Sequence, residues 1–295
     1  MYAELIRNRA FQGSSQNGQA STVRTTDFWH PIGNVQLSVE PSSPALSPSL
    51  TYDLRIDVPS GTTGPIGFYN DGFWGFDVDA AKRYAASFSI KGAYNGGVTV
   101  GFNNTLSGTQ LSKTTIQVNS SDGVWTSVHP VVFQPFSTPG SPNNTFTHVF
   151  DGAQLAGKSI QVNLLSVFKQ TYKDRPNGVR EDLAASFDGL ESTWVRLPGG
   201  NNMQGLSIGN EWHWDRTYGD LKNRTGHIGT WGDYQTDGFG VLEMMQWATD
   251  SNQTIVLGIF AGLHIGGALV TEDNLGGYVD STMNYLEFLK VSSPS

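Results

Sequence analysis

The residues best suited to chemistry lie in a polar, tryptophan-rich segment between Trp194 and Trp231. Its aromatic side chains offer flat faces that can stack on sugar rings, and its amides and carboxylates can bind sugar hydroxyls. Within it, the pair Asn210-Glu211 has the form of a glycosidase acid/base, which works beside a second carboxylate about 5 Å away. No apolar strand leads into this pair. We therefore expect Glu211 to be a loop residue and only a weak candidate for catalysis.

A second polar group surrounds the end of a short apolar stretch. Arg196 precedes Pro198-Gly199-Gly200, and Asn201 follows directly. Paired glycines let the backbone turn close to a ligand, and barrel enzymes build their sites at the carboxyl ends of the strands. Arg196 and Asn201 would then face the mouth of a site, although a tight turn with a solvated Arg accounts for the spacing equally well.

Other chemistries have less support. The histidines of this region lack metal-ligand spacing with supporting carboxylates, so we expect no metal and no other cofactor; they are His213, His227 and His264. No serine lies in a nucleophile-elbow motif. The chain has no Cys, which excludes disulfides and thiolate chemistry.

Acidic residues further along the chain divide into two groups. Glu243 and Glu287 fall on predicted helices, where we expect them to be solvated. Glu272 and Asp273 follow a predicted strand and could lie at the mouth of a site. They could equally be first-turn acids that stabilise a helix N-terminus.

The elements that must position these residues change type along the chain. Residues 1–12 have the pattern of a short amphipathic helix, and residues 13–157 show alternating apolar and polar positions between Gly, Pro, Ser and Asn turns. That alternation predicts a two-sheet β-sandwich. Its aromatic cluster at 68–75 is either core with a turn, which we favour, or an exposed carbohydrate-binding platform.

From residue 158 the pattern becomes strand, helix, strand, helix, strand, helix. We predict strands at 161–168, 194–197 and 254–260, and helices with apolar positions at 179–190, 241–248 and 279–289. The continuous apolar run at 254–260 predicts a strand buried on both faces of a parallel sheet. Three such βα units are too few to close a (β/α)8 barrel, which predicts either a fragment or a protein that completes its sheet in another way.

Composition and charge restrict the partners. The 295 residues carry a net charge of −8 with a pI near 5.1, which argues against nucleic acid or an anionic membrane as partner. No apolar run approaches the length of a membrane span. N-x-S/T sequons give mild support for secretion, while the first residues do not form a signal peptide; the sequons begin at Asn103, Asn119, Asn143, Asn223 and Asn252.

Several motifs together resemble one family. The segments 2–11 (Tyr-Ala-Glu-Leu-Ile-Arg-Asn-Arg-Ala-Phe), 72–75 (Gly-Phe-Trp-Gly), 172–178 (Tyr-Lys-Asp-Arg-Pro-Asn-Gly), 196–202 (Arg-Leu-Pro-Gly-Gly-Asn-Asn) and 229–232 (Gly-Thr-Trp-Gly) resemble the fungal-type α-L-arabinofuranosidases of glycoside hydrolase family fifty-one. The match runs in order along nearly the whole chain. In that family a sandwich similar to a carbohydrate-binding module is inserted near the start of a (β/α)8 barrel. The resemblance thus implies a barrel-start segment at 1–12, the sandwich at 13–157, and a partial barrel at 158–295.

The resemblance also implies roles for individual residues. Arg196 would support the nucleophile, Asn201 would bind arabinose hydroxyls, and Trp231 would pack against the sugar. The family's acid/base Glu follows a helix similar to 278–289, and its nucleophile lies further on, so both are expected beyond Ser295. Glu211 does not match the acid/base position, because this loop precedes the family's third strand.

The implied function is retaining hydrolysis of terminal non-reducing arabinofuranosyl residues in arabinan or arabinoxylan, by an extracellular enzyme that needs no cofactor. With no catalytic carboxylate among its residues, this chain would be inactive by itself. Two alternatives stay open: a non-catalytic carbohydrate-binding protein in which the sandwich is the active part, and another barrel glycosidase such as an endoglucanase. For the implied arabinofuranosidase, the expected partners are arabinose-containing polysaccharides, with no nucleic acid and no membrane.

Overall fold

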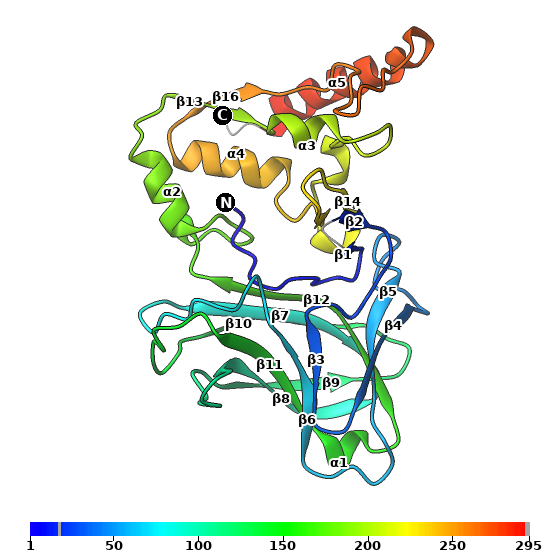
Figure 1. Cartoon of the computed structure of the whole chain (residues 1–295), viewed down its shortest axis with the longest axis vertical. Coiled ribbons are helices and arrows are strands. Elements are labelled where there is room, and N and C mark those ends of the chain that lie inside the picture. The colour runs from blue at the N-terminus through cyan, green and yellow to red at the C-terminus, as the bar shows by residue number, and fades with distance from the viewer. Residues whose placement is uncertain (17–18, 293–295) are drawn as a thin grey trace. The chain divides into compact units, whose positions relative to one another are not determined.

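The protein is described by a computed structural model that covers residues 1–16 and 19–292 and divides into two compact units (Figure 1). The sandwich unit comprises Met1–Ser14 and Val23–Glu181. The βα unit comprises Ser15–Thr22 and Asp182–Ser295.

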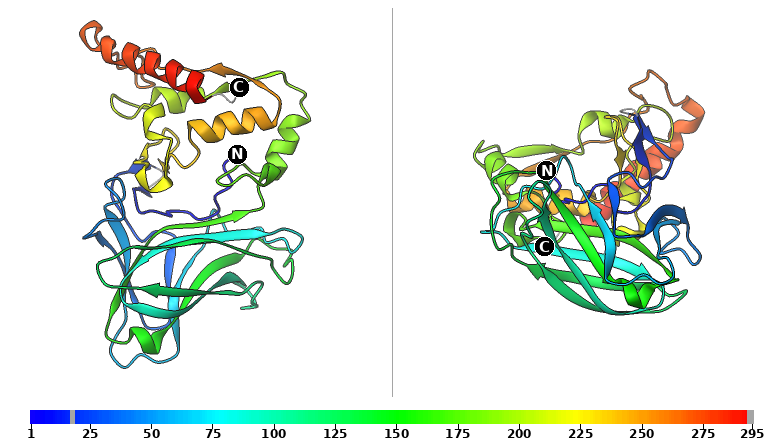
Figure 2. Two further views of the ribbon diagram at one scale, coloured as in Figure 1. Left: turned by 180° about the vertical axis from the view of Figure 1, so that it is seen from behind. Right: turned by 60° about the horizontal axis from the view of Figure 1, so that its bottom comes forward.

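The sandwich unit contains two five-stranded sheets in which the paired strands run antiparallel. In spatial order, the first holds β10 (Thr126–Phe133), β7 (Tyr84–Lys91), β12 (Ser159–Lys169), β5 (Tyr52–Asp57) and β4 (Gln36–Pro41). The second holds β3 (Trp29–Ile32), β6 (Pro65–Asn70), β11 (Asn144–Asp151), β8 (Tyr94–Asn104) and β9 (Thr114–Ser120). The alternating segments of the sequence are therefore strands, as predicted, and two further views show their arrangement (Figure 2).

One hydrophobic cluster holds the two sheets together. Alternate side chains of a strand point to the same face, so β7 buries Tyr84, Phe88 and Ile90 on one side. On the other sheet, Phe146 of β11 lies opposite Phe102 of β8, and both are fully buried. Burying side chains of this size contributes about 1.5–3 kcal/mol each, which is the main source of the unit's stability.

Two predictions for this part of the chain are wrong. Residues 1–12 contain no helix; the first residues are extended, with bridges from Tyr2 to Val179 and from Glu4 to Phe168, and residues 7–10 form a turn. The Glu4 carboxylate accepts hydrogen bonds from the Val167 N–H at 3.0 Å and the Ser166 hydroxyl at 2.6 Å, and these contacts fix the extended path. The segment 161–168 does not start a parallel sheet, because β12 pairs antiparallel with β5 and β7.

The βα unit follows the predicted alternation of helices and strands. Its main elements are α2 (Glu181–Asp188), β13 (Trp194–Leu197), α3 (Gly200–Gln204), α4 (Val241–Asp250), β16 (Thr254–Leu257) and α5 (Glu272–Ser292). The boundary between the two units falls after Glu181, the first residue of α2. The strands β13 and β16 pair in parallel, with Arg196 beside Val256 and Leu197 beside Leu257. Parallel neighbours need a crossover connection, and α4 lies on that connection.

Helix α4 exists as predicted, and three of the four positions that predict its apolar face are buried, Val241, Met244 and Ala248, while the fourth, Met245, is partly buried. Helix α5 exists as predicted, but three of the four positions that we used to identify it are exposed: Val279, Met283 and Leu286. The strand β16 is not buried on both faces, since Val256 is 46% exposed. In the described part of the chain β16 pairs with β13 alone, so its second edge has no neighbouring strand.

Short elements complete the chain: β1 (Ser14–Gln16) with β2 (Gln19–Ser21), α1 (Gly152–Leu155), β14 (His227–Ile228) with β15 (Tyr234–Gln235), and three 3₁₀ turns at Tyr172–Asp174, Trp214–Arg216 and Leu221–Asn223. None of the described helices combines the length and the apolar character needed to cross a membrane.

Candidate active site

Arg196 and Asn201 lie on either side of the turn that connects β13 to α3. Both side chains are exposed. A methyl group on Gly200 would lie 3.6 Å from Nη2 of Arg196, so the guanidinium lies over the glycine turn. The neighbouring strand ends at the same level, because Gly258 donates its N–H to the Leu197 carbonyl at 2.8 Å. The structure thus brings Arg196 and Asn201 together at the carboxyl end of the parallel pair, where α/β proteins bind ligands.

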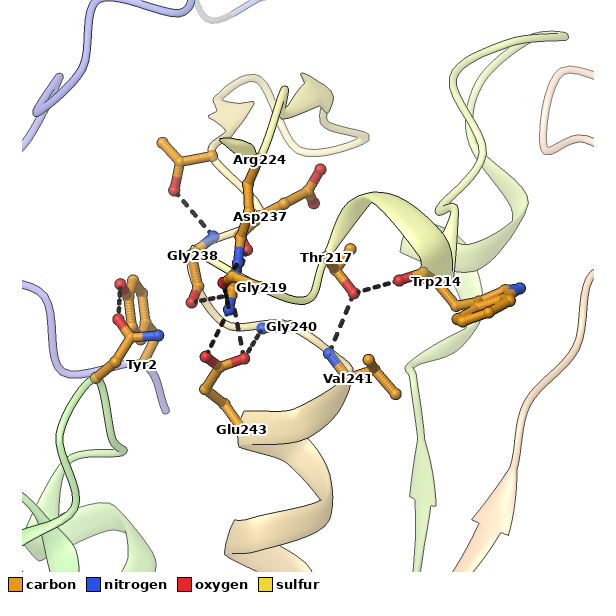
Figure 3. Close-up of polar contacts among 12 residues, drawn as sticks. Tyr2, Trp214, Thr217, Gly219, Arg224, Asp237, Gly238, Gly240, Val241 and Glu243 are labelled. Carbon is orange, nitrogen blue, oxygen red and sulfur yellow. Dashed lines mark hydrogen bonds and ion pairs between the residues drawn. The ribbon is translucent and has the colours of Figure 1, made fainter. Parts of the chain in front are cut away.

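The long loop after α3 is held in place by a buried ion pair (Figure 3). Arg224 is 3% exposed and binds both carboxylate oxygens of Glu243, at 2.8 and 3.1 Å. The same guanidinium donates to the carbonyls of Gly219 at 3.0 Å and Gly238 at 2.9 Å. Arg suits this role, because its planar fork can satisfy several acceptors at once. The prediction that Glu243 is solvated is therefore wrong. Its side chain connects the loop to the start of α4.

A second contact fixes the same helix start (Figure 3). The Thr217 hydroxyl accepts the Val241 N–H at 3.1 Å and donates to the Trp214 carbonyl at 2.9 Å. A methyl group on Gly240 would lie 1.7 Å from the Thr217 carbonyl oxygen, so only glycine permits this approach. The Glu243 carboxylate accepts the Gly240 N–H at 2.9 Å, which caps the helix.

A buried histidine links this loop to α3. His227 lies 3.0 Å from the Asn202 side-chain oxygen through Nε2 and 3.0 Å from the Asp237 carboxylate through Nδ1. His227 and Asp237 have side chains that are 8% and 6% exposed. Because Asn202 follows Asn201 directly, this chain of contacts fixes the first turn of α3 as well as the hairpin β14–β15.

Trp231 lies in the turn of that hairpin and is 75% exposed. The turn is tight: a methyl group on Gly229 would lie 2.3 Å from the Asp233 carbonyl oxygen. Gly232, which follows Trp231, accepts a hydrogen bond from the Ser15 hydroxyl through its carbonyl oxygen at 2.6 Å. A fixed backbone therefore presents an indole whose faces are open to solvent, which is the arrangement that ring stacking requires.

Glu211 is engaged with its own surroundings rather than open to a ligand. It is 3% exposed, with Oε1 accepting from the Tyr278 hydroxyl at 2.8 Å and Oε2 from the Gly209 N–H at 2.7 Å. His213 lies 3.4 Å from Oε1. Glu211, His213 and Tyr278 line a cavity of about 40 Å³ that also touches Phe260, just past the end of β16.

The electrostatics of this cavity favour an ionised carboxylate. Burial raises the pKa of Glu211, but hydrogen bonds from the backbone and from Tyr278, together with His213, outweigh it and leave the pKa below its ordinary value. Burial and the bond to Glu211 raise the pKa of Tyr278 to about 12. Burial and then the charge of Arg216 lower the pKa of His213. A general acid needs a raised pKa, so Glu211 has the wrong environment for that role.

The remaining acidic and histidine candidates also find places. Within residues 1–16 and 19–292, no group of three or more His, Asp or Glu side chains could hold a metal ion. Glu287 is 64% exposed beside Lys290, as expected for a solvated residue. Glu272 and Asp273 are exposed in the first turn of α5, which agrees with the helix-start alternative.

Sequence reasoning did not identify Asn202, Arg224 or Asp237 as residues that shape this region. The aspartate has a backbone φ of 54°, which is uncommon for a residue other than glycine. Its neighbour Gly238 gives only a faint signal of an unusual turn. The pairing of Arg224 with Glu243 joins positions nineteen apart across a loop, a separation that no helical or strand period reveals.

Comparison with known proteins agrees with the resemblance seen in the motifs. Residues 186–295 match the model of the α-L-arabinofuranosidase 1 domain. The probable α-L-arabinofuranosidase A of Aspergillus terreus is 35% identical over 292 residues, which is 98% of this chain and 45% of the relative. α-L-Arabinofuranosidase A of Aspergillus niger is 33% identical, with 98% of this chain and 45% of the relative covered.

A solved structure matches as well. The arabinose-bound MgGH51 α-L-arabinofuranosidase is 33% identical and superimposes with a TM-score of 0.88 over 96% of this chain and 45% of that protein. These similarities all point to one class of protein. It is the α-L-arabinofuranosidases of glycoside hydrolase family fifty-one, which the chain resembles over nearly its whole length, and the chain spans about 45% of the length of the relatives it matches.

Proposed function

We propose that this chain supplies part of the arabinose-binding side of an α-L-arabinofuranosidase that removes terminal non-reducing arabinofuranosyl residues from arabinan or arabinoxylan with retention of configuration. The observation that carries the proposal is the turn after β13, where Arg196 and Asn201 stand exposed at the carboxyl end of a parallel strand pair. The similarity to an arabinose-bound relative over 96% of the chain supports the same reading.

We assign separate roles to the three exposed residues. Arg196 lines the arabinose subsite and also holds a nucleophilic carboxylate in its ionised form, since a neighbouring guanidinium favours the charged state. Asn201 binds arabinose hydroxyls through its amide, and Trp231 packs against the ring. The exposure of all three residues and the tight turn beneath Trp231 support these roles.

We place the general acid/base and the nucleophile outside these 295 residues. The support is the state of Glu211, whose two oxygens are both hydrogen-bonded within the protein. A retaining glycosidase needs one carboxyl with a raised pKa and a second carboxylate roughly 5–5.5 Å away. The pKa of Glu211 is lowered, so this residue does not suit the role of the general acid.

For the architecture, we propose that the sandwich, with β12 as its last strand, is a jelly-roll module similar to carbohydrate-binding modules, inserted after a barrel-start segment at 1–12. Residues 182–295 would then contribute the first strands of a (β/α)8 barrel. The parallel pair β13–β16, with α4 on its crossover, supports this assignment.

We also propose that the protein acts outside the cell. In the described structure the sequon residues Asn119, Asn143, Asn223 and Asn252 are exposed, which glycosylation requires. Production in a secreting fungal host should give a product whose mass falls after deglycosylation, and an unchanged mass would contradict the inference.

Saturation-transfer NMR with L-arabinose tests the binding proposal on the purified chain. We expect a transfer signal for the wild type that is lost in Arg196→Ala and Asn201→Ala. The matched controls Lys222→Ala and Gln246→Ala, a cation and an amide elsewhere in the βα unit, should keep it. Equal signals from all five proteins would contradict the assignment.

Hydrolysis of an aryl α-L-arabinofuranoside tests the position of the catalytic carboxylates. We expect the chain to show no turnover above the buffer rate. Turnover that disappears in Glu211→Gln would instead make Glu211 catalytic and overturn our assignment.

A further inference from the structure

The sandwich unit carries an exposed aromatic turn of its own. Trp74 is 86% exposed and Phe73 is 48% exposed, in the turn that follows β6. The sequence pattern favours a buried cluster at 68–75, which holds for Phe68 but not for these two residues. Trp and Phe side chains are seldom left this open, and an exposed cluster of them marks a binding surface.

A single buried side chain organises the surface around this turn. Asn70 is fully buried at the end of β6. Its oxygen accepts the N–H groups of Gly72 at 2.9 Å and Arg7 at 3.3 Å, and its amide donates to the carbonyls of Arg7 at 3.0 Å and Phe28 at 3.1 Å. Three segments that are distant in sequence are therefore fixed relative to one another.

The backbone of the turn is itself pressed onto the sandwich. Gly75 donates its N–H to the Asp71 carbonyl at 2.9 Å, and Phe76 donates to the Pro142 carbonyl at 2.9 Å. A methyl group on Gly75 would lie 1.9 Å from that Pro142 oxygen, so the approach needs glycine. Trp74 has a φ of 59°, a strained value that persists only where the surrounding structure imposes it. The indole is thus held outward by a rigid turn.

An arginine lies among the aromatic rings. The Arg7 guanidinium carbon is 3.9 Å from the centre of the Phe28 ring, 5.5 Å from Phe73 and 5.7 Å from Trp74. These distances are within the range of cation–π attraction, which orients the guanidinium. Its N–H groups are donors only, so apolar ring faces and oriented donors lie side by side.

Polar groups border the same turn. His30 lies 3.2 Å from the Asp71 carboxylate, and its ring stacks on Tyr69 with centres 4.8 Å apart. A sugar presents an apolar C–H face and a rim of hydroxyl groups that both donate and accept, which this combination of rings, donors and a carboxylate matches. Single-stranded nucleic acid also stacks on aromatic rings, but it needs a basic groove for its phosphates, and this chain has a net charge of −8.

We propose that the Phe73–Trp74 turn of the sandwich unit, with Arg7 and Phe28, is a binding platform for the sugar rings of a neutral polysaccharide. Trp74 stacks on a ring, and Arg7 donates to its hydroxyls. The platform would hold the chain on its polymer, whereas the Arg196 turn would take the terminal residue. The choice of arabinoxylan as probe rests on the proposed function, but the platform itself does not.

Native affinity electrophoresis of the whole 295-residue chain in gels containing soluble arabinoxylan tests the platform. We expect the wild type to be retarded and the apparent dissociation constant to rise at least about fivefold in Trp74→Ala, since stacking on one aromatic side chain accounts for roughly a tenfold change in affinity. Phe136→Ala removes another exposed aromatic of the sandwich unit, 67% exposed, and should leave retardation unchanged. Trp74→Phe should restore part of the binding.

Two results would overturn the platform: no retardation of the wild type, or equal retardation of the wild type and Trp74→Ala. If Trp74→Ala fails to fold by circular dichroism, Phe73→Ala takes its place with the same expected loss. Arg196→Ala separates this proposal from the proposed function. It should lose the arabinose NMR signal and keep its retardation, so each proposal can fail without the other.

Discussion

Replacing His148 by Phe should stabilise the sandwich unit, and more strongly in acid than at neutral pH. The His148 ring is 1% exposed in the core, stacked on Phe68 with centres 4.9 Å apart and edge-on to Phe88 and Phe146 at 5.4 and 5.3 Å. Neither ring nitrogen has a hydrogen-bond partner among the described residues. Burial lowers the pKa of His148 from 6.5 to about 3.

The sign of the pH effect follows from this lowered pKa. As the pH falls below 6.5, His148 binds a proton in the unfolded chain, whereas in the folded chain it stays neutral until about pH 3. The free energy of unfolding therefore falls by about 1.4 kcal/mol per pH unit across this window. At about pH 5 the loss is about 2 kcal/mol. Phe removes that loss, and it also removes two buried unpaired nitrogens, which adds about 1 kcal/mol at any pH.

Urea unfolding followed by tryptophan fluorescence at about pH 7 and pH 5 measures both effects, with Trp29 close enough to report, its ring centre 6.4 Å from that of His148. We expect His148→Phe to exceed the wild type by about 1 kcal/mol at neutral pH and about 3 kcal/mol at pH 5. His129 is exposed, so His129→Phe is the matched control and should show the wild-type pH slope. A stability difference between His148→Phe and the wild type that is the same at both pH values would refute the reasoning.

Two further predictions concern the βα unit. Arg224→Met should lower its unfolding free energy by about 3–5 kcal/mol, because the substitution removes the arginine that pairs with the buried Glu243 carboxylate. The control Lys290→Ala breaks an exposed ion pair and should change the unfolding free energy by less than about 0.5 kcal/mol. Equal effects of the two substitutions in urea unfolding would contradict the role of the buried pair. Glu211→Gln should cost about 1–3 kcal/mol at neutral pH, because an amide cannot accept from both Tyr278 and the Gly209 N–H. Since the pKa of Glu211 is lowered, its contribution is present above the ordinary value of 4.5 and is lost as the pH falls further, so a gap from the wild type that does not narrow in acid would count against this account.

Strands and helices were predictable wherever one local period dominates. Strict alternation identified the sandwich strands, and the spacing of Val241, Met244 and Ala248 identified α4 with its buried face. The short run at 161–168 was assigned to the wrong sheet, because a continuous apolar strand fits a parallel sheet and the middle of an antiparallel sheet equally well. A local pattern does not contain the identity of the partner strand.

Contacts between distant residues account for the other errors. Glu243 looked like a solvated helix residue, yet its partner Arg224 comes from the preceding loop. Trp74 looked like core, and only the tertiary contacts of Asn70 show that the turn points outward. The exposure of Val279 on α5 was equally unpredictable, since a helix with apolar residues on more than one face does not reveal which face is covered.

Two of the candidate site residues, Asn201 in α3 and Trp231 in the β14–β15 turn, lie on segments that buried contacts of the βα unit join. The Asn202–His227–Asp237 contacts join the α3 turn to the hairpin that carries Trp231. A pocket that must distinguish a transition state from a substrate gains from such fixed positions, since misplacement by about 1 Å costs large factors in rate. The buried contacts of Asn202, His227 and Asp237 therefore determine whether Asn201 and Trp231 can act together.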